Sequence, residues 1–65
     1  MEEYKYVIKV GYNKYLQFID DIEDYWLVNN KKLAKVLSEE WYEKRVDILN
    51  KLIELGLTIP HFESA

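Results

Sequence analysis

The sequence predicts a small α+β domain that spans residues 1–65. Two patterns lead to this prediction: side chains alternate over residues 4–10, as in a strand, and apolar residues recur at helical spacing over 14–28 and 39–55. A chain of this length forms one domain and buries only about 60% of the surface that its unfolded form exposes. An all-α bundle with an extended N-terminal arm is the alternative architecture.

The first element is a strand over Tyr4–Val10, which reads Y-K-Y-V-I-K-V. Tyr and aliphatic residues fall on one face, while Lys5 and Lys9 fall on the other, so the strand should be half exposed. A single strand is not stable alone. It can pair with the C-terminal segment, with its twin in a second copy or with a strand of a partner.

The second predicted element is a helix over residues 14–28, which Gly11 separates from the strand and Asn13 caps. An arc of apolar side chains would form one face of this helix, with the carboxylates of residues 20–24 opposite. From this helix we assign Ile19, Ile22 and Trp26 to the core or to a dimer seam.

A reversal is expected at Asn29 and Asn30, followed by a short helix over 31–37. Ser38 then caps a helix over 39–55, and Gly56 ends it as the C′ residue. Residues 31–55 could also form one continuous helix. The 39–55 helix contributes further residues to the core or dimer seam: Trp41, Tyr42, Leu49, Leu52 and Ile53.

The last predicted element is a strand over residues 57–62. Pro60 cannot donate a hydrogen bond to a neighbouring strand, which restricts this segment to the edge of a sheet. Residues 63–65 are expected to fray.

Composition excludes several classes of protein. The chain has no Cys and a net charge of −3, which rules out a disulfide framework and does not indicate a nucleic-acid binder. No apolar run is long enough for a membrane span, so we expect a soluble, cytoplasmic protein. Its charges cluster by sign, which predicts a locally dipolar surface.

No cofactor, metal or catalytic activity is expected. Residues 20–24 read D-D-I-E-D, which is similar to the magnesium-binding motif of prenyl diphosphate synthases. Those enzymes need a deep helical cavity and a second carboxylate motif, for which this chain has no room, so we interpret the run as a solvated acidic surface. Alternatively, it meets a basic surface on a target or imitates phosphates. His61 is the only His, and it has no nucleophile as an obvious partner.

Two Trp, six Tyr and two Phe are more large rings than 65 residues can readily enclose. Tyr, Trp and Arg are enriched among residues that dominate protein interfaces. We therefore predict a non-enzymatic protein-binding module, a homodimer, that inhibits or modulates a macromolecular partner. Its predicted partner-binding surface is aromatic and acidic: Tyr4, Tyr6, Tyr12, Asp20, Asp21, Asp24, Tyr25 and Arg45.

The alternative function is a regulator that binds nucleic acid in the manner of a helix-turn-helix protein. Lys31, Lys32 and Lys35 flank an L-A-x-x-L pattern that resembles the first helix of such motifs. The next helix opens with Glu39 and Glu40, which would meet the phosphates with negative charge.

Glu23 and Arg45 each interrupt a predicted apolar arc. A buried charge without a partner costs several kcal/mol, so the two could form a buried ion pair. Alternatively, the Arg45 stem lies on apolar surface with its head in water, or Arg45 contacts a partner.

Overall fold

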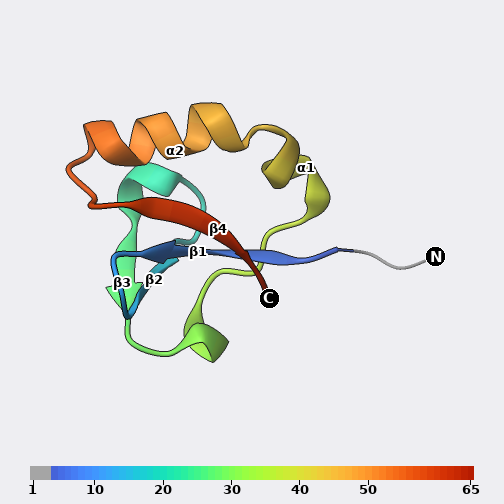
Figure 1. Cartoon of the computed structure of the whole chain (residues 1–65), viewed down its shortest axis with the longest axis horizontal. Coiled ribbons are helices and arrows are strands. Elements are labelled where there is room, and N and C mark those ends of the chain that lie inside the picture. Colours follow the sequence, from blue (N-terminus) through green and yellow to red (C-terminus); the bar gives the residue numbers. More distant parts are fainter. Residues whose placement is uncertain (1–3) are drawn as a thin grey trace.

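A computed structural model describes residues 4–65 and has a mixed α+β fold, as predicted (Figure 1). The elements follow in the order β1 (Tyr6–Val10), β2 (Lys14–Gln17), η1 (Ile22–Asp24), β3 (Trp26–Val28), η2 (Lys31–Leu33), α1 (Glu39–Glu43), α2 (Arg45–Glu54) and β4 (Pro60–Ser64), where η marks a 3₁₀ helix. The strands form one antiparallel sheet in the order β3-β2-β1-β4. The all-α alternative is therefore wrong.

The largest correction concerns residues 14–28, which form two strands and a 3₁₀ turn instead of one helix. Gly11 adopts φ 66° and begins a three-residue hairpin loop that returns β2 onto β1. Asp21 accepts a hydrogen bond from the backbone N–H of Glu23 at 3.0 Å and so caps η1. The segment is rich in aromatic and β-branched residues, which favour strands when a neighbouring strand is present.

Strand β1 is paired on both sides within the chain. The whole of β4 pairs with it, from Tyr6 opposite Ser64 to Val10 opposite Pro60. On the other side β2 pairs near the hairpin, and Tyr6 exchanges two backbone hydrogen bonds with Leu37 at the far end. Of the three pairings considered for this strand, the intramolecular one is present.

The C-terminal strand is an edge strand, as Pro60 predicts, but it lies further along the chain than expected. The predicted fraying of residues 63–65 is wrong, because β4 extends to Ser64 and the Ala65 N–H donates to the Lys5 carbonyl at 3.0 Å. Pairing with β1 supplies the hydrogen bonds that hold these residues.

The helix predicted over 39–55 begins at Glu39, but Lys44 divides it into α1 and α2. Ser38 is at the N-cap position without a side-chain hydrogen bond. Gly56 ends α2 at φ 94°, and the Leu57 N–H donates to the Leu52 carbonyl at 3.1 Å, which is a Schellman motif. The predicted stop at Gly56 is confirmed.

The region 31–37 contains only the single 3₁₀ turn η2, so no helix continues from it into α1. The first helix of the predicted helix-turn-helix motif, over residues 31–37, is accordingly not formed. No helix within residues 4–65 is long and apolar enough to cross a membrane.

The core lies between the sheet and α2, which runs along one face of the sheet (Figure 1). Its buried residues come from both layers: Ile8, Val10, Leu16, Phe18, Leu37 and Leu52. On the opposite face, Val7 is also buried, although alternation predicted a half-exposed face there. The η2 segment lies on that side of the sheet, where Gln17 donates to the Leu33 carbonyl at 2.8 Å.

Within residues 4–65, Ile59 carries backbone strain. Ile59 precedes β4 with φ 47°, a left-handed conformation that β-branched residues rarely adopt, and 64% of it is exposed. Because little packing would be lost, Ile59→Gly should stabilise the domain by about 1 kcal/mol. Urea denaturation measures this change. A lower midpoint in the variant would mean that the Ile59 side chain contributes more than its backbone costs.

Candidate functional site

A cluster of aromatic rings lies where the chain enters β1. Tyr6 of β1 and Tyr42 of α1 stack with their ring centroids 4.3 Å apart and their planes at 11°. Phe62 of β4 meets both rings edge-on, at 6.3 Å from Tyr6 and 5.7 Å from Tyr42. Rings from three elements therefore support one another, which fixes their orientation.

Arg45, the first residue of α2, covers this cluster from outside. Its guanidinium carbon lies 4.4 Å from the Tyr42 ring centroid, and Nη1 donates to the Tyr42 carbonyl at 3.0 Å. The side chain is exposed. Cation–π attraction and the hydrogen bond hold the guanidinium in place while leaving it accessible to a partner.

The predicted Glu23–Arg45 ion pair is absent. Glu23 instead pairs with Lys51 of α2 at 2.7 Å, and both side chains are partly exposed. The prediction assumed two antiparallel helices, whereas Glu23 belongs to the short turn η1, and its ion pair joins this turn to the second half of α2. Arg45 matches the alternative in which the stem lies on apolar surface and the head is in water.

Burial among these rings raises the pKa of the Tyr6 hydroxyl, and the neighbouring Tyr42, Glu39 and Tyr4 add to this effect. Arg45 acts in the opposite direction. The hydroxyl therefore remains a protonated hydrogen-bond donor further into alkaline conditions than an ordinary tyrosine.

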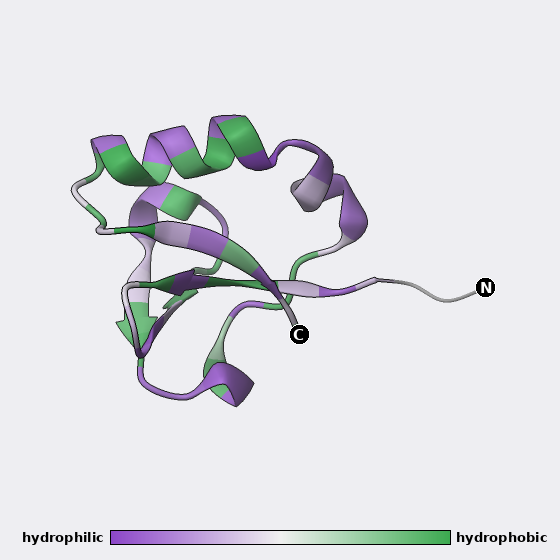
Figure 2. Ribbon diagram, in the orientation of Figure 1, coloured by the Kyte–Doolittle hydropathy of each residue, from purple (hydrophilic) through white to green (hydrophobic). Residues whose placement is uncertain are grey.

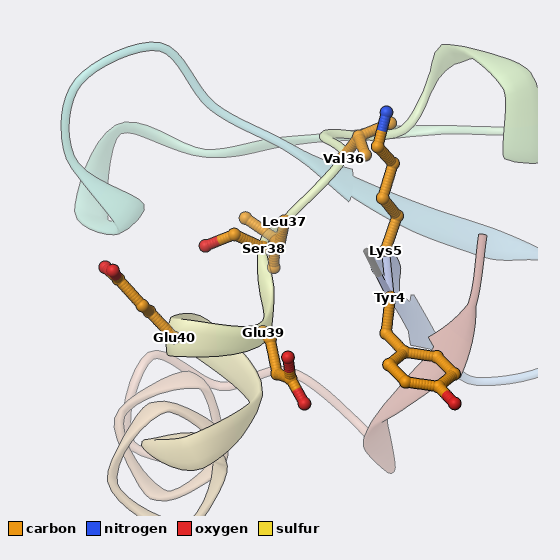
Figure 3. Close-up of a pocket in the computed structure, with 7 residues that line it drawn as sticks. All are labelled: Tyr4, Lys5, Val36, Leu37, Ser38, Glu39 and Glu40. Carbon is orange, nitrogen blue, oxygen red and sulfur yellow. The ribbon is translucent and has the colours of Figure 1, made fainter. Parts of the chain in front are cut away.

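An open groove of about 400 Å³ adjoins the cluster. It lies beside the backbone pairing of Tyr6 with Leu37, and Leu37 lines it. The Glu39 carboxylate points toward the Tyr4 ring, whereas Glu40 points away from it (Figure 3). The residues that line it come from the chain before β1 and from the start of α1: Tyr4, Lys5, Val36, Leu37, Ser38, Glu39 and Glu40.

We call the cluster and the groove together the aromatic–acidic end, defined by Tyr4, Tyr6, Glu39, Glu40, Tyr42 and Arg45. Tyr4 is 57% exposed and Val36, in the groove wall, is 53% exposed. The groove thus offers apolar surface beside two carboxylates, an arrangement that can accept a side chain with an apolar stem and a cationic head.

Three of the predicted partner-binding residues, Tyr4, Tyr6 and Arg45, meet at this end. Tyr12 does not, because it lies in the β1–β2 hairpin loop, where it is 91% exposed. Tyr25 packs partly against the core. The predicted acidic residues lie at η1 and not in the groove: Asp20, Asp21 and Asp24.

The residues predicted for the core or a dimer seam divide into two groups. Leu52 is fully buried, Ile22, Trp41 and Leu49 pack against the core, and Tyr42 joins the aromatic cluster. The other three are surface residues of this chain: Ile19, Trp26 and Ile53. Their exposure excludes these three residues from the core, and their assignment to a dimer seam stays a prediction. Ile19 and Trp26 do not lie on the predicted helix, and Ile53 faces outward from α2.

Glu63 lies at the centre of a cluster of ionisable side chains that was not predicted from the sequence. Its carboxylate contacts Lys31 at 3.1 Å, His61 at 3.7 Å and Lys9 at 4.0 Å. The hydrogen bond from Lys31 lowers the pKa of Glu63, and the charges of Lys31, Lys9 and His61 act in the same direction against the effect of burial. In the sequence, the one available signal is that His61 and Glu63 are two residues apart, a spacing that places two side chains of a strand on the same face of the sheet.

This lowered pKa predicts a pH effect on stability. An ionised Glu63 stabilises the fold above the ordinary carboxyl pKa of 4.5, and this contribution disappears as the pH falls through the lower folded-state value. Glu63→Gln should therefore be less stable than the wild type at neutral pH and should lose less stability on acidification. Thermal melts across this pH range compare the two proteins. If the melting temperatures of the two proteins fell equally on acidification, the ion pairs of Glu63 would not contribute to stability.

Residues 4–65 contain no group of three or more His, Asp or Glu side chains placed to hold a metal ion. Comparisons of the chain with protein-family models, with curated proteins and with solved structures found no match.

Proposed function

We propose that this chain is a small non-enzymatic protein-binding module that inhibits or modulates a macromolecular partner through its aromatic–acidic end. The observation that supports the proposal is the Tyr6–Tyr42 stack, with Arg45 held on its outer ring, beside a groove bordered by Glu39. Tyr and Arg are the residues that most often dominate interface energetics, and here packing has already fixed their orientation.

The chemistry of the groove favours a particular kind of partner. Glu39 and Glu40 would attract a surface that carries Lys or Arg, while Tyr4 and Val36 offer contacts for apolar groups. Complementary charge accelerates association and sets orientation, and the rings supply contact area. A cytoplasmic partner is proposed because a chain without Cys suits a reducing compartment.

Affinity capture with matched variants tests this proposal. Tyr4→Ala together with Glu39→Lys should reduce recovery of the captured partner at least about tenfold, since one change removes contact area and the other reverses a charge. Tyr12→Ala is the control, because it removes an even more exposed ring that lies in the hairpin loop and not in the groove. Equal recovery by all three proteins would contradict the proposal.

Self-association is proposed on a separate surface. Strand β1 is already paired within the chain, so a dimer would use the outer side of α2, where Val46 and Ile53 are 65% and 57% exposed and lie seven residues apart on one face. Sedimentation of the wild type and of Val46→Glu measures it. A wild-type monomer at high micromolar concentration would rule the dimer out.

A further inference from the structure

The two sides of the sheet differ in charge. On the helix side, α1, α2 and η1 carry seven carboxylates, and α1 and α2 with the residue between them carry three cations. The carboxylates are Glu23, Asp24, Glu39, Glu40, Glu43, Asp47 and Glu54, and the cations are Lys44, Arg45 and Lys51. Lysines lie on the opposite face, on β1, just before it and on η2: Lys5, Lys9, Lys31 and Lys32. Figure 2 shows hydrophilic residues at α1 and at η2, on opposite sides of the sheet. The predicted dipolar surface thus corresponds to an excess of carboxylates on the helix side and an excess of lysines on the opposite face.

One row of side chains crosses the sheet on the face opposite the helices. Its members are paired directly across the strands, His61 with Lys9, Lys9 with Tyr15, and Tyr15 with Val28. Directly paired residues share a face, and four strands at about 4.8 Å spacing give a row about 14 Å long. The row therefore presents a cation and an aromatic ring side by side at the centre of the sheet.

Aromatic surface is accessible on this same face. Trp26 of β3 is paired with Gln17 of β2, so the two side chains lie on the same face of the sheet. The Gln17 side chain donates to the Leu33 carbonyl of η2, so the Trp26 ring lies on the side of the sheet away from α2. It is 45% exposed. Lys9 Nζ lies 5.9 Å from the Tyr15 ring centroid, which places a cation beside the second ring.

The cations of this face exceed its carboxylates. Within the described residues of β1, β2, η2 and β4, Glu63 is the only carboxylate, and it contacts both Lys9 and Lys31. Lys5 and Lys32 are exposed. An anionic ligand would therefore meet net positive charge here, although the chain as a whole has a net charge of −3.

We propose that this face binds single-stranded nucleic acid through two or three nucleotides, with bases stacked on Trp26 and Tyr15 and phosphates near Lys9, Lys31 and Lys32. Rings beside a cationic surface are the usual means of binding unpaired bases, and a four-stranded sheet can hold about two or three of them. A duplex keeps its bases stacked inside and cannot use the rings. This site is separate from the aromatic–acidic end and does not depend on the protein-binding proposal.

Fluorescence anisotropy with labelled oligo(dT) and oligo(U) of about 12 nucleotides tests the proposal. Trp26→Ala should weaken binding at least about fivefold through lost stacking, and Lys32→Glu should do so through charge. Lys44→Glu is the matched control, because it makes the same charge change at an exposed position between α1 and α2. Circular dichroism of each variant confirms that the fold is retained.

The salt dependence provides a second measure. Contact with about three phosphates predicts a slope near −2 in a plot of log K against log salt concentration. No binding at low salt, or equal weakening by Lys32→Glu and Lys44→Glu, would overturn the proposal. Tighter binding of duplex DNA, or heparin binding with no effect of Trp26→Ala on the oligonucleotides, would show a surface that attracts polyanions without stacking and would equally overturn it.

Discussion

Leu52→Ala is expected to leave most of the protein unfolded at room temperature. Leu52 has no exposed surface and packs in the core between α2 and the sheet. Truncating a buried Leu costs about 3 to 5 kcal/mol, and the free energy of unfolding of a small domain is of similar size. Circular dichroism and urea denaturation would show the loss of structure.

The neighbouring residue provides the control for this prediction. Ile53 lies on the same helix but is 57% exposed, so Ile53→Ala should lower the free energy of unfolding by less than about 1 kcal/mol. The contrast tests the orientation of α2 as well as the burial of one residue. A wild-type urea midpoint for Leu52→Ala would be incompatible with the core described above.

Trp41→Ala is expected to have the second largest effect. Trp41 is half-buried and packs on Phe18, with ring centroids 5.5 Å apart at 50°. Its removal should cost about 3 kcal/mol, whereas removal of the exposed Trp26 should cost less than about 1 kcal/mol. Urea denaturation of the two single variants gives these differences. The reverse order would place Trp26 in the core and would contradict the sheet register.

The elements that could be predicted from the sequence are those with local signals. Alternation marks β1, Glu39 and Glu40 follow a cap residue, and Gly56 ends a helix by adopting a left-handed backbone. Each of these signals depends on residues within a few positions of one another. The α+β class follows from such elements.

Residues 14–28 could not be assigned in this way. Phe18 and Ile22 fit a helical repeat and pack on the core, yet the chain between them turns away from β2. The choice between helix and strand depends on β1, which offers a hairpin partner after the Gly11 turn. Pairing with another segment decided the structure, and single-sequence periodicity does not report such pairing.

The aromatic–acidic end was predictable only in part. Tyr4, Tyr6 and Arg45 were selected by residue type, because aromatic residues and Arg are frequent in interfaces. The stack of Tyr6 on Tyr42 joins β1 to α1, whereas Tyr42 was predicted for the core or a dimer seam. Contacts between segments distant in sequence leave no periodic signal, which also explains why the two lysines and the histidine around Glu63 were not predicted.

Site-specific photocrosslinking tests the proposed protein-binding site most directly. A photoreactive phenylalanine analogue replaces Tyr4 in one protein and Tyr12 in another, two exposed tyrosines of which only Tyr4 lines the groove. After irradiation in the cell that makes the protein, the Tyr4 position should give a discrete crosslinked protein band, which Glu39→Lys weakens, and the Tyr12 position should give none. A crosslink from Tyr12 with none from Tyr4 would contradict the assignment of the aromatic–acidic end as the binding surface.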